Sequence, residues 1–139
     1  MTGFRRKLMK SSKEIRNSHD ITNFDYNNAA NWADGFQWGT NGALAAHTTR
    51  SAFKIAVPCK PQTSYKRIFV NTDESEKPIN GYVMWREIDS TGKVLKTNSW
   101  TDAFTSTATT THVLIFVDSN AAVSEWVKKY GMPFTFMEV

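Results

Sequence analysis

Three of the five tryptophans in this chain of 139 residues lie among polar side chains. Trp32 and Trp38 flank the segment 34–37 (DGFQ), and Trp100 lies within the polar segment 98–102 (NSWTD). A sugar ring has an apolar C–H face and a rim of hydroxyls, so a flat aromatic ring bordered by Asn, Gln, Asp and Thr matches it chemically. The competing interpretation is burial, because tryptophan commonly anchors the core of a small domain. Trp32, Trp38 and Trp100 are therefore candidate glycan-binding residues.

Residues suited to metal binding or nucleophilic catalysis are scattered along the chain. His19, His47 and His112 lie far apart, and none has a Cys, His or Asp at the spacing of a metal site. The single cysteine, Cys59, has no nucleophile motif around it, and no phosphate-binding loop or G-x-S-x-G turn occurs. Thirteen acidic residues offer pairs of carboxylates, as any chain of this composition does. The sequence therefore predicts a protein that is not an enzyme, with no catalytic residues, metal site or cofactor.

Positive charge is concentrated at the N-terminus. Residues 1–16 hold six of the seventeen Lys and Arg residues against one acid, which makes the segment +5, whereas residues 17–139 are −1. A protein that grips a polyanion with its fold spreads cations over one face of that fold, so nucleic acid is not an expected partner of the body. The sequence thus divides into a basic arm, residues 1–16, and a domain, residues 17–139.

The arm has the pattern of a short amphipathic helix, because Phe4, Leu8 and Ile15 share one helical face. About 13 residues are marginal as an isolated helix in water, so order would have to come from docking. The alternative is a solvated terminal tail. We predict that the arm anchors the protein to acidic surfaces of partner proteins. Apolar and basic residues form this anchor: Phe4, Arg5, Arg6, Lys7, Leu8, Lys10 and Ile15.

Composition is that of one globular domain with a single core. The lone cysteine excludes an intramolecular disulfide and suits assembly in a reducing cytoplasm. No segment approaches the roughly 20 apolar residues that span a bilayer, and the N-terminus lacks the apolar region of a signal peptide. No membrane association is expected.

Alternation of apolar and polar residues predicts a β-domain after a loop-rich entry. Residues 17–42 are dense in Asn, Asp and Gly, which favours loops with a short strand near 35–38. In 52–57, Phe53, Ile55 and Val57 alternate with Ala52, Lys54 and Ala56, so this segment is expected to be a strand with those three residues inward, ended by Pro58. Further strands are expected at 65–71, 79–88, 94–95, 112–117 and 134–139.

The connections complete the predicted fold. Residues 89–93 (DSTGK) predict a hairpin turn, in which Gly92 can adopt the left-handed backbone conformation. The segment 112–117 is apolar enough to be buried on both faces, and 121–130 has the spacing of one short helix. Many short strands without long crossover helices favour an all-β antiparallel sandwich over a parallel sheet.

From about Trp32 to the C-terminus, the order of these signals resembles the carbohydrate-binding-module-like jelly-roll domains of tailed-bacteriophage structural and adhesion proteins. The start of the chain, GFRRKLM at 3–9, is similar to basic arms of phage virion proteins. The first motifs are a W-x-x-G loop at 32–35, a strand that ends in Val-Pro at 57–58 and a strand that begins with Tyr65. They are followed by a strand that runs into D-x-x-G-K at 83–93, a Phe-Thr segment at 104–105 and an apolar strand at 113–116.

This resemblance implies a jelly-roll-like domain in a virion assembled in the host cytoplasm, at a tail, baseplate or capsid surface. Its partners would be other virion proteins through the arm, and host cell-surface glycans are the candidate ligand. Many copies on one particle would make weak sugar contacts adequate. Two alternatives remain: a purely architectural capsid or tail decoration or connector without a ligand, and an ancillary carbohydrate-binding module of a hydrolase.

Overall fold

The computed structural model describes residues 25–69, 79–119, 122–131 and 134–139. The anchoring residues predicted in the arm, Phe4 to Ile15, lie outside the described residues, as does His19. The described elements, in chain order, are η2 (Ala29–Asn31), β1 (Trp32–Trp38), β2 (Leu44–Phe53), β3 (Val57–Pro58), β4 (Ser64–Phe69), β5 (Ile79–Ile88), β6 (Val94–Thr101), β7 (Ala103–Thr105), β8 (His112–Ser119), α2 (Val123–Tyr130) and β9 (Phe134–Glu138).

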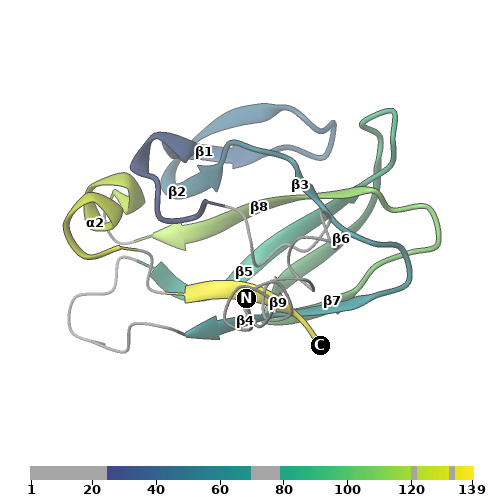
Figure 1. Ribbon diagram of the computed structural model, residues 1–139. Helices are drawn as coiled ribbons and strands as arrows, with labels where there is room; N and C mark the ends of the chain where they lie inside the picture. The colour runs from purple at the N-terminus through teal and green to yellow at the C-terminus, as the bar shows by residue number, and fades with distance from the viewer. Residues whose placement is uncertain (1–24, 70–78, 120–121, 132–133) are drawn as a thin grey trace, which may run out of the picture.

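The strands form two antiparallel sheets (Figure 1). Sheet A has the order β1-β2-β8-β5-β6, with β3 also paired to β8, and sheet B has the order β7-β4-β9. Sheet B lies along the lower side of Figure 1, and α2 lies at one end of the molecule. The predicted all-β antiparallel sandwich is confirmed.

The main core fills the space between the two sheets. Aromatic contacts join them there: the ring of Phe104 on β7 lies 4.8 Å from that of Trp85 on β5 and 5.6 Å from that of Tyr65 on β4. Such offset and tilted pairs contribute roughly 0.5–1.5 kcal/mol beyond their buried area. The buried residues of this cluster are Tyr26, Trp32, Phe53, Val57, Cys59, Tyr65, Val83, Trp85, Phe104, Val113, Ile115, Val117, Val123, Trp126 and Val127.

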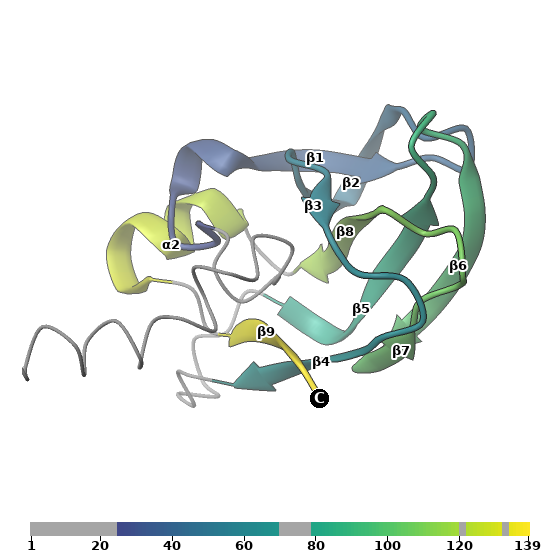
Figure 2. The ribbon, with the colours of Figure 1, turned by 45° about the vertical axis from the view of Figure 1, so that its right-hand side comes forward.

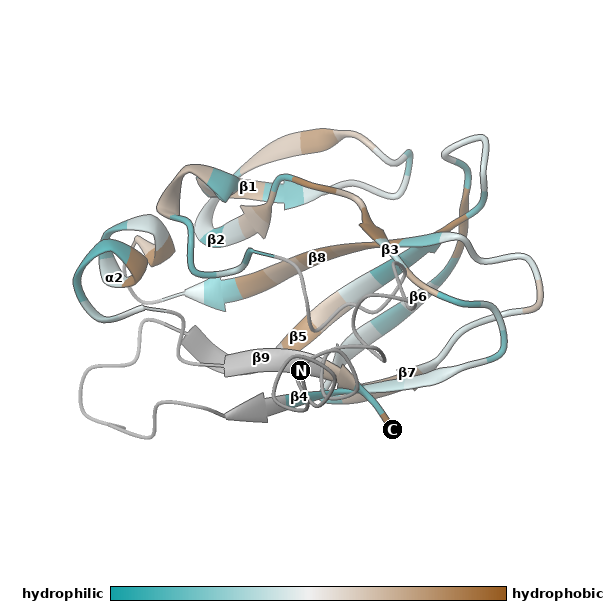
Figure 3. Ribbon diagram, viewed as in Figure 1, coloured by the Kyte–Doolittle hydropathy of each residue, from teal (hydrophilic) through white to brown (hydrophobic). Residues whose placement is uncertain are grey.

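Strand β8 is buried on both faces, as its continuous apolar run predicts. Val113, Ile115 and Val117 face sheet B, while Leu114 and Phe116 point to the opposite side and are equally buried. In the hydropathy view, β8 is hydrophobic through its middle and polar at its C-terminal end (Figure 3). The outer side of sheet A therefore carries apolar side chains of its own and is not a fully solvated surface.

The predicted hairpin between β5 and β6 is confirmed. The carboxylate of Asp89 accepts hydrogen bonds from the backbone N–H groups of Thr91 and Lys93 and from the Thr91 hydroxyl. These bonds stabilise the ionised form and hold the pKa of Asp89 below its ordinary value. Gly92 has φ +87°, the left-handed conformation for which a glycine was expected.

The strand predicted at 52–57 is the main error of the sequence analysis. Strand β2 ends at Phe53, and pairing resumes only at Val57 in β3. Between them the chain bends, the backbone N–H of Lys54 donates to the carbonyl of Asn31, and Ile55 is 38% exposed rather than inward. The alternating pattern was present, but the bend keeps only Phe53 and Val57 in the core.

The helix predicted at 121–130 is present as α2, and a residue of β1 caps it. Its N-cap residue, Ala122, has no side chain able to accept a hydrogen bond. Asp34 of β1 takes this role, because its carboxylate accepts from the backbone N–H of Ser124 at 3.2 Å and from the Ser124 hydroxyl. Negative charge at a helix N-terminus is favourable, so this contact fixes α2 against sheet A.

Sheet A curls until elements from its two halves meet. Gly42, in the β1–β2 loop, approaches the β5–β6 turn so closely that a Cβ on it would lie 2.9 Å from the carbonyl oxygen of Gly92. Arg86 on β5 donates from Nε to the carbonyl oxygen of Trp38 on β1 at 2.6 Å. Both hairpin tips lie at the same end of the molecule (Figure 2). The outer side of sheet A is therefore a curled face, bounded by its own hairpins.

We expect Gly42→Ala to destabilise the protein more than Gly92→Ala. Both glycines have positive φ, which costs an alanine about 1 kcal/mol. Only at Gly42 would the methyl group also strike a backbone oxygen, whereas a Cβ on Gly92 meets nothing within 4 Å. Urea unfolding should give a loss of about 2–3 kcal/mol for Gly42→Ala and about 1 kcal/mol for Gly92→Ala. Equal losses would show that the two tips do not touch.

Candidate functional site

Trp32 is a core residue and does not belong to a binding surface. It is 3% exposed, its ring packs edge-on against Phe53 at 5.2 Å, and its indole N–H donates to the backbone carbonyl of Tyr26. A ring enclosed in this way has no face on which a sugar could stack. The prediction of Trp32 as a glycan-binding residue is therefore wrong, because β1 begins at this position and directs the side chain between the sheets.

The other two candidates, Trp38 and Trp100, come together on the curled face. Both are half-buried, and both pack against a second hydrophobic cluster of Ala52, Met84 and Phe116. These three residues come from the central strands β2, β5 and β8, on the side of sheet A turned away from the main core. The curled face therefore joins aromatic residues that are 62 positions apart in the sequence.

A β-bulge turns Trp100 onto this face. In the β5–β6 pair, Ser99 and Trp100 together oppose the single residue Met84. Regular alternation from Asn98, which points toward the main core, would place Trp100 on the core side as well. The extra residue reverses this, and Trp100 packs edge-on against Phe116 at 5.9 Å.

The backbone at Trp100 is strained by this arrangement. Its φ is +47°, and a bulky residue in the left-handed region costs about 1–3 kcal/mol. Bulges and strained residues of this kind are concentrated at functional sites, where they aim a side chain. The fold thus holds Trp100 on the curled face against the local preference of its backbone.

Arg50 on β2 braces the ring of Trp100. Its Cζ atom lies 4.8 Å from the centre of the Trp100 ring and 5.7 Å from that of Phe116, a cation–π geometry. The same guanidinium donates to Oε1 of Gln37, and its Nε lies 3.4 Å from Oδ1 of Asp118. Because the ring is held before any ligand arrives, binding would lose little side-chain entropy.

Arg86 on β5 is a second cation that packs against the aromatic residues of the curled face. It is 8% exposed, its Cζ lies 5.3 Å from the Phe116 ring, and it donates to the carbonyl of Trp38 and to the hydroxyl of Thr97. Both acceptors are neutral. Burial, and secondly the charge of Arg50, lower the pKa of Arg86 from its ordinary value. A buried cation with this surrounding is uncommon, because buried charges are usually paired with opposite charge.

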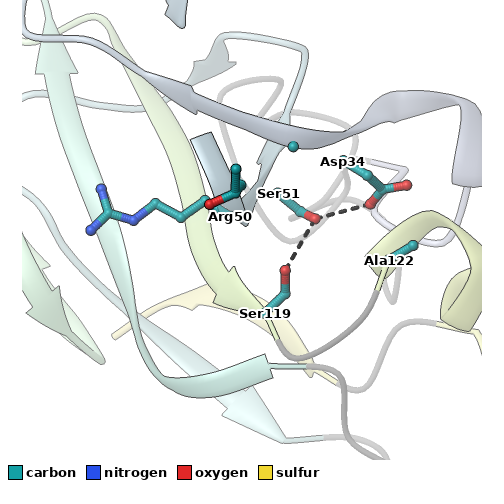
Figure 4. Close-up of a pocket in the computed structure, with 7 residues that line it drawn as sticks. Asp34, Arg50, Ser51, Ser119 and Ala122 are labelled. Carbon is teal, nitrogen blue, oxygen red and sulfur yellow. Dashed lines mark hydrogen bonds between the residues drawn. The ribbon is translucent and has the colours of Figure 1, made fainter. Parts of the chain in front are cut away.

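A separate pocket of about 240 Å³ lies beside the N-terminus of α2 (Figure 4). Ser51 donates to Asp34 at 2.9 Å and lies 3.4 Å from the Ser119 hydroxyl, while the Arg50 guanidinium points away from both Ser51 and Asp34. The lining holds no His or Lys, and its carboxylate, Asp34, also accepts hydrogen bonds from Ser124 at the start of α2. The arrangement joins β1, β2 and α2, and its lining residues are Asp34, Gly35, Thr48, Arg50, Ser51, Ser119 and Ala122.

Cys59 and Glu87 are buried in positions that suit structure. Cys59 is 3% exposed, and burial, with the charge of Glu87 as a smaller cause, raises its pKa to about 12, so the reactive thiolate is scarce at neutral pH. Glu87 is fully buried and accepts hydrogen bonds from Asn98, from Thr110 and from the backbone of Thr107. The carboxylate thereby ties β5 to β6 and to the loop before β8.

Within the part of the chain that the structure describes, no three His, Cys, Asp or Glu residues are grouped as a metal site. The same residues include no helix that is both long and apolar enough to cross a bilayer. Comparison of the chain with protein-family models, with curated proteins and with solved structures gives no match.

Sequence reasoning missed Arg50, Arg86 and Phe116 as members of the site. One signal was available: in the strand predicted at 79–88, Arg86 lies on the same face as the apolar residues Met84 and Ile88, opposite to Trp85. A cation on the buried stretch of a strand points to a specific role. Arg50 gave no comparable signal, because the strand containing it was predicted to start two residues later.

We expect Trp100→Gly to be more stable than Trp100→Ala. Both variants lose the ring and its contacts with Phe116 and Arg50, so these losses cancel in the comparison. Glycine adopts φ +47° without the steric cost of a Cβ, which gives a difference of about 1 kcal/mol in the free energy of unfolding. Denaturant unfolding of the two variants measures it. If alanine proves equal or better, the backbone at position 100 is not strained.

Proposed function

We propose that this protein is a non-catalytic binding module that holds saccharides on the curled face, through Trp38 and Trp100. The observation that carries the proposal is the bulge that turns Trp100 outward at the cost of a left-handed backbone. A ring needed only for packing could have been buried by regular alternation. Aiming it at the outer side of sheet A provides an aromatic surface for the C–H face of a sugar.

Polar groups beside the two rings supply the directional contacts that sugar recognition requires. Gln37, Thr97 and Asp118 offer amide, hydroxyl and carboxylate groups around the aromatic cluster. Asp118 is 40% exposed at its side chain, so it is open to a ligand hydroxyl. This combination of braced rings and adaptable polar neighbours supports binding without a chemical step.

The wider role that we propose is that of a bacteriophage virion protein, displayed in many copies and attached through its basic arm. This part rests on the resemblance of the motifs to phage jelly-roll domains and on the separation of charge between arm and body. Weak binding of single sugars would suffice there, because linking many sites raises avidity by roughly 10²–10⁴ without any new contact.

One observation favours a purely architectural role instead. Trp32, Trp85 and Trp126 are all core residues, so most of the tryptophans serve the fold. In that alternative Trp38 and Trp100 would close the outer side of sheet A and bind nothing. The two functions differ in what loss of one exposed ring does to ligand binding.

We expect the intact protein to bind a subset of a glycan array and Trp100→Ala to lose at least about 90% of that binding, since stacking of this kind is worth about 1.4 kcal/mol or more. Tyr130→Ala is the matched control. Tyr130 is also an exposed aromatic residue at 40%, but it lies on α2, outside the curled face. Circular dichroism spectra should be the same for all three proteins.

Either of two results would contradict the glycan proposal. One is an intact protein that binds no glycan on the array, which would favour the architectural role. The other is equal loss of binding in Trp100→Ala and Tyr130→Ala, which would show that the effect does not come from the curled face.

For the arm, we expect deletion of residues 1–16 to leave a folded domain that no longer joins its assembly. The deletion changes the net charge from +4 to −1 and removes none of the described core. Thermal unfolding tests the fold, and co-sedimentation with assembled particles tests attachment. Attachment of the shortened protein at the level of the full chain would refute the anchoring role.

A further inference from the structure

Two cations share one aromatic ring at the centre of the curled face. The Cζ atoms of Arg50 and Arg86 lie 5.7 and 5.3 Å from the centre of the Phe116 ring. Two like charges in one cluster repel each other, and burial of Arg86 adds a desolvation cost. A negative charge beside the two arginines, from the protein or from a ligand, would therefore be favourable.

The described residues supply only part of that charge. Asp118 meets Arg50 through a single contact of 3.4 Å, and the Asp118 side chain is 40% exposed, so solvent weakens the pair. None of the ion pairs among the described residues involves Arg86, whose two hydrogen-bond acceptors are a carbonyl and a hydroxyl. The two arginines and Asp118 leave one positive charge uncompensated.

We propose that the ligand of the curled face is an acidic sugar, with its carboxylate bound beside Arg50 and Arg86 while the sugar ring stacks on Trp100. This inference rests on the proposed saccharide function and narrows it to a chemical class. A carboxylate matches the planar guanidinium fork and forms strong charge-assisted hydrogen bonds with it. Arg50 is the entry point, because its side chain is 23% exposed.

The charge of the surroundings favours a sugar over a nucleic acid. Single-strand binders combine stacking rings with a groove of cations that follows several phosphates. The body of this protein is −1 overall, and the curled face holds one uncompensated charge. One charge suits a ligand with one acidic group for each stacked ring.

The test is an array on which each acidic oligosaccharide stands beside its neutral, carboxyl-reduced form. Two such pairs are sialyllactose beside sialyllactose whose carboxylate has been reduced to a primary alcohol, and trigalacturonate beside galactotriose. We expect the intact protein to bind the acidic member of at least one pair about ten-fold or more tighter than its neutral partner, because a charge-assisted hydrogen bond is about twice as strong as a neutral one. This preference should shrink as salt concentration rises.

Three substitutions test which cations produce the preference for acidic sugars. Arg50→Gln should bring the ratio of acidic to neutral affinity toward one, whereas Lys54→Gln, which removes an exposed cation in the bend between β2 and β3, should leave the ratio unchanged. Arg86→Lys keeps the charge but loses the fork and should lower the ratio by a smaller factor. Because Arg50 is half-buried, folding of Arg50→Gln is checked by its unfolding midpoint.

The outcomes separate the two proposals. Binding of neutral glycans equal to or tighter than that of acidic ones, with loss in Trp100→Ala, would overturn the acidic ligand and leave the saccharide function standing. An acidic preference that survives Arg50→Gln would also overturn the inference. Absence of all glycan binding refutes both proposals, and binding of an oligothymidylate in preference to every glycan would assign the face to nucleic acid.

Discussion

The contact between Arg86 and the backbone of Trp38 holds the curled face in its shape. Arg86 on β5 reaches across sheet A to the far edge strand, β1, and donates to the Trp38 carbonyl at 2.6 Å. This donation brings the half of the sheet with β1 over the half with β5 and β6, where Gly42 meets the turn at Gly92. A flat sheet would leave Trp38 and Trp100 at opposite edges, since their strands β1 and β6 end the strand order. The aromatic surface thus depends on a buried cation, which is the source of both its geometry and its charge.

Sheet A can curl because the apolar side chains on its two sides form two separate clusters. The side toward sheet B is a continuous core, in which Trp85 and Phe104 link the sheets. The other side has a smaller set of buried apolar groups, which includes Leu114 and the cluster of Ala52, Met84 and Phe116, and the half-buried Trp38 and Trp100 pack against that cluster. Because this buried apolar cluster is small, it covers only part of the Trp38 and Trp100 rings, and the rest of each ring stays in contact with solvent. The rings of Trp38 and Trp100 can therefore be reached from solvent, whereas those of the main core are enclosed.

Local pattern predicts much of the fold because most strands bury one or both faces. The apolar run of β8, the aromatic strand β5 and the helical spacing of α2 each place their own residues without help from distant contacts. Strand β2 escapes prediction over its first half, where small and polar residues are exposed and no alternation exists to read. The bend after Phe53 escapes it as well, because the bend follows from a hydrogen bond to Asn31, a residue 23 positions away.

The site was only partly predictable for a related reason. Polar neighbours single out Trp38 and Trp100, but the same criterion selects Trp32, whose surroundings in sequence say nothing of the core that encloses it. Strand register decides which of the three tryptophans reaches the outer side of sheet A. Trp100 reaches it only through the extra residue of a bulge, and the periodicity of the sequence does not reveal such an insertion. The arginines add a further constraint, since their cation–π contacts with Trp100 and Phe116 arise only when β2, β5, β6 and β8 are assembled. A surface built from register, curvature and charge is thus a property of the folded sheet, and the acidic sugar that we propose as its ligand matches that surface with both an apolar face and a negative charge.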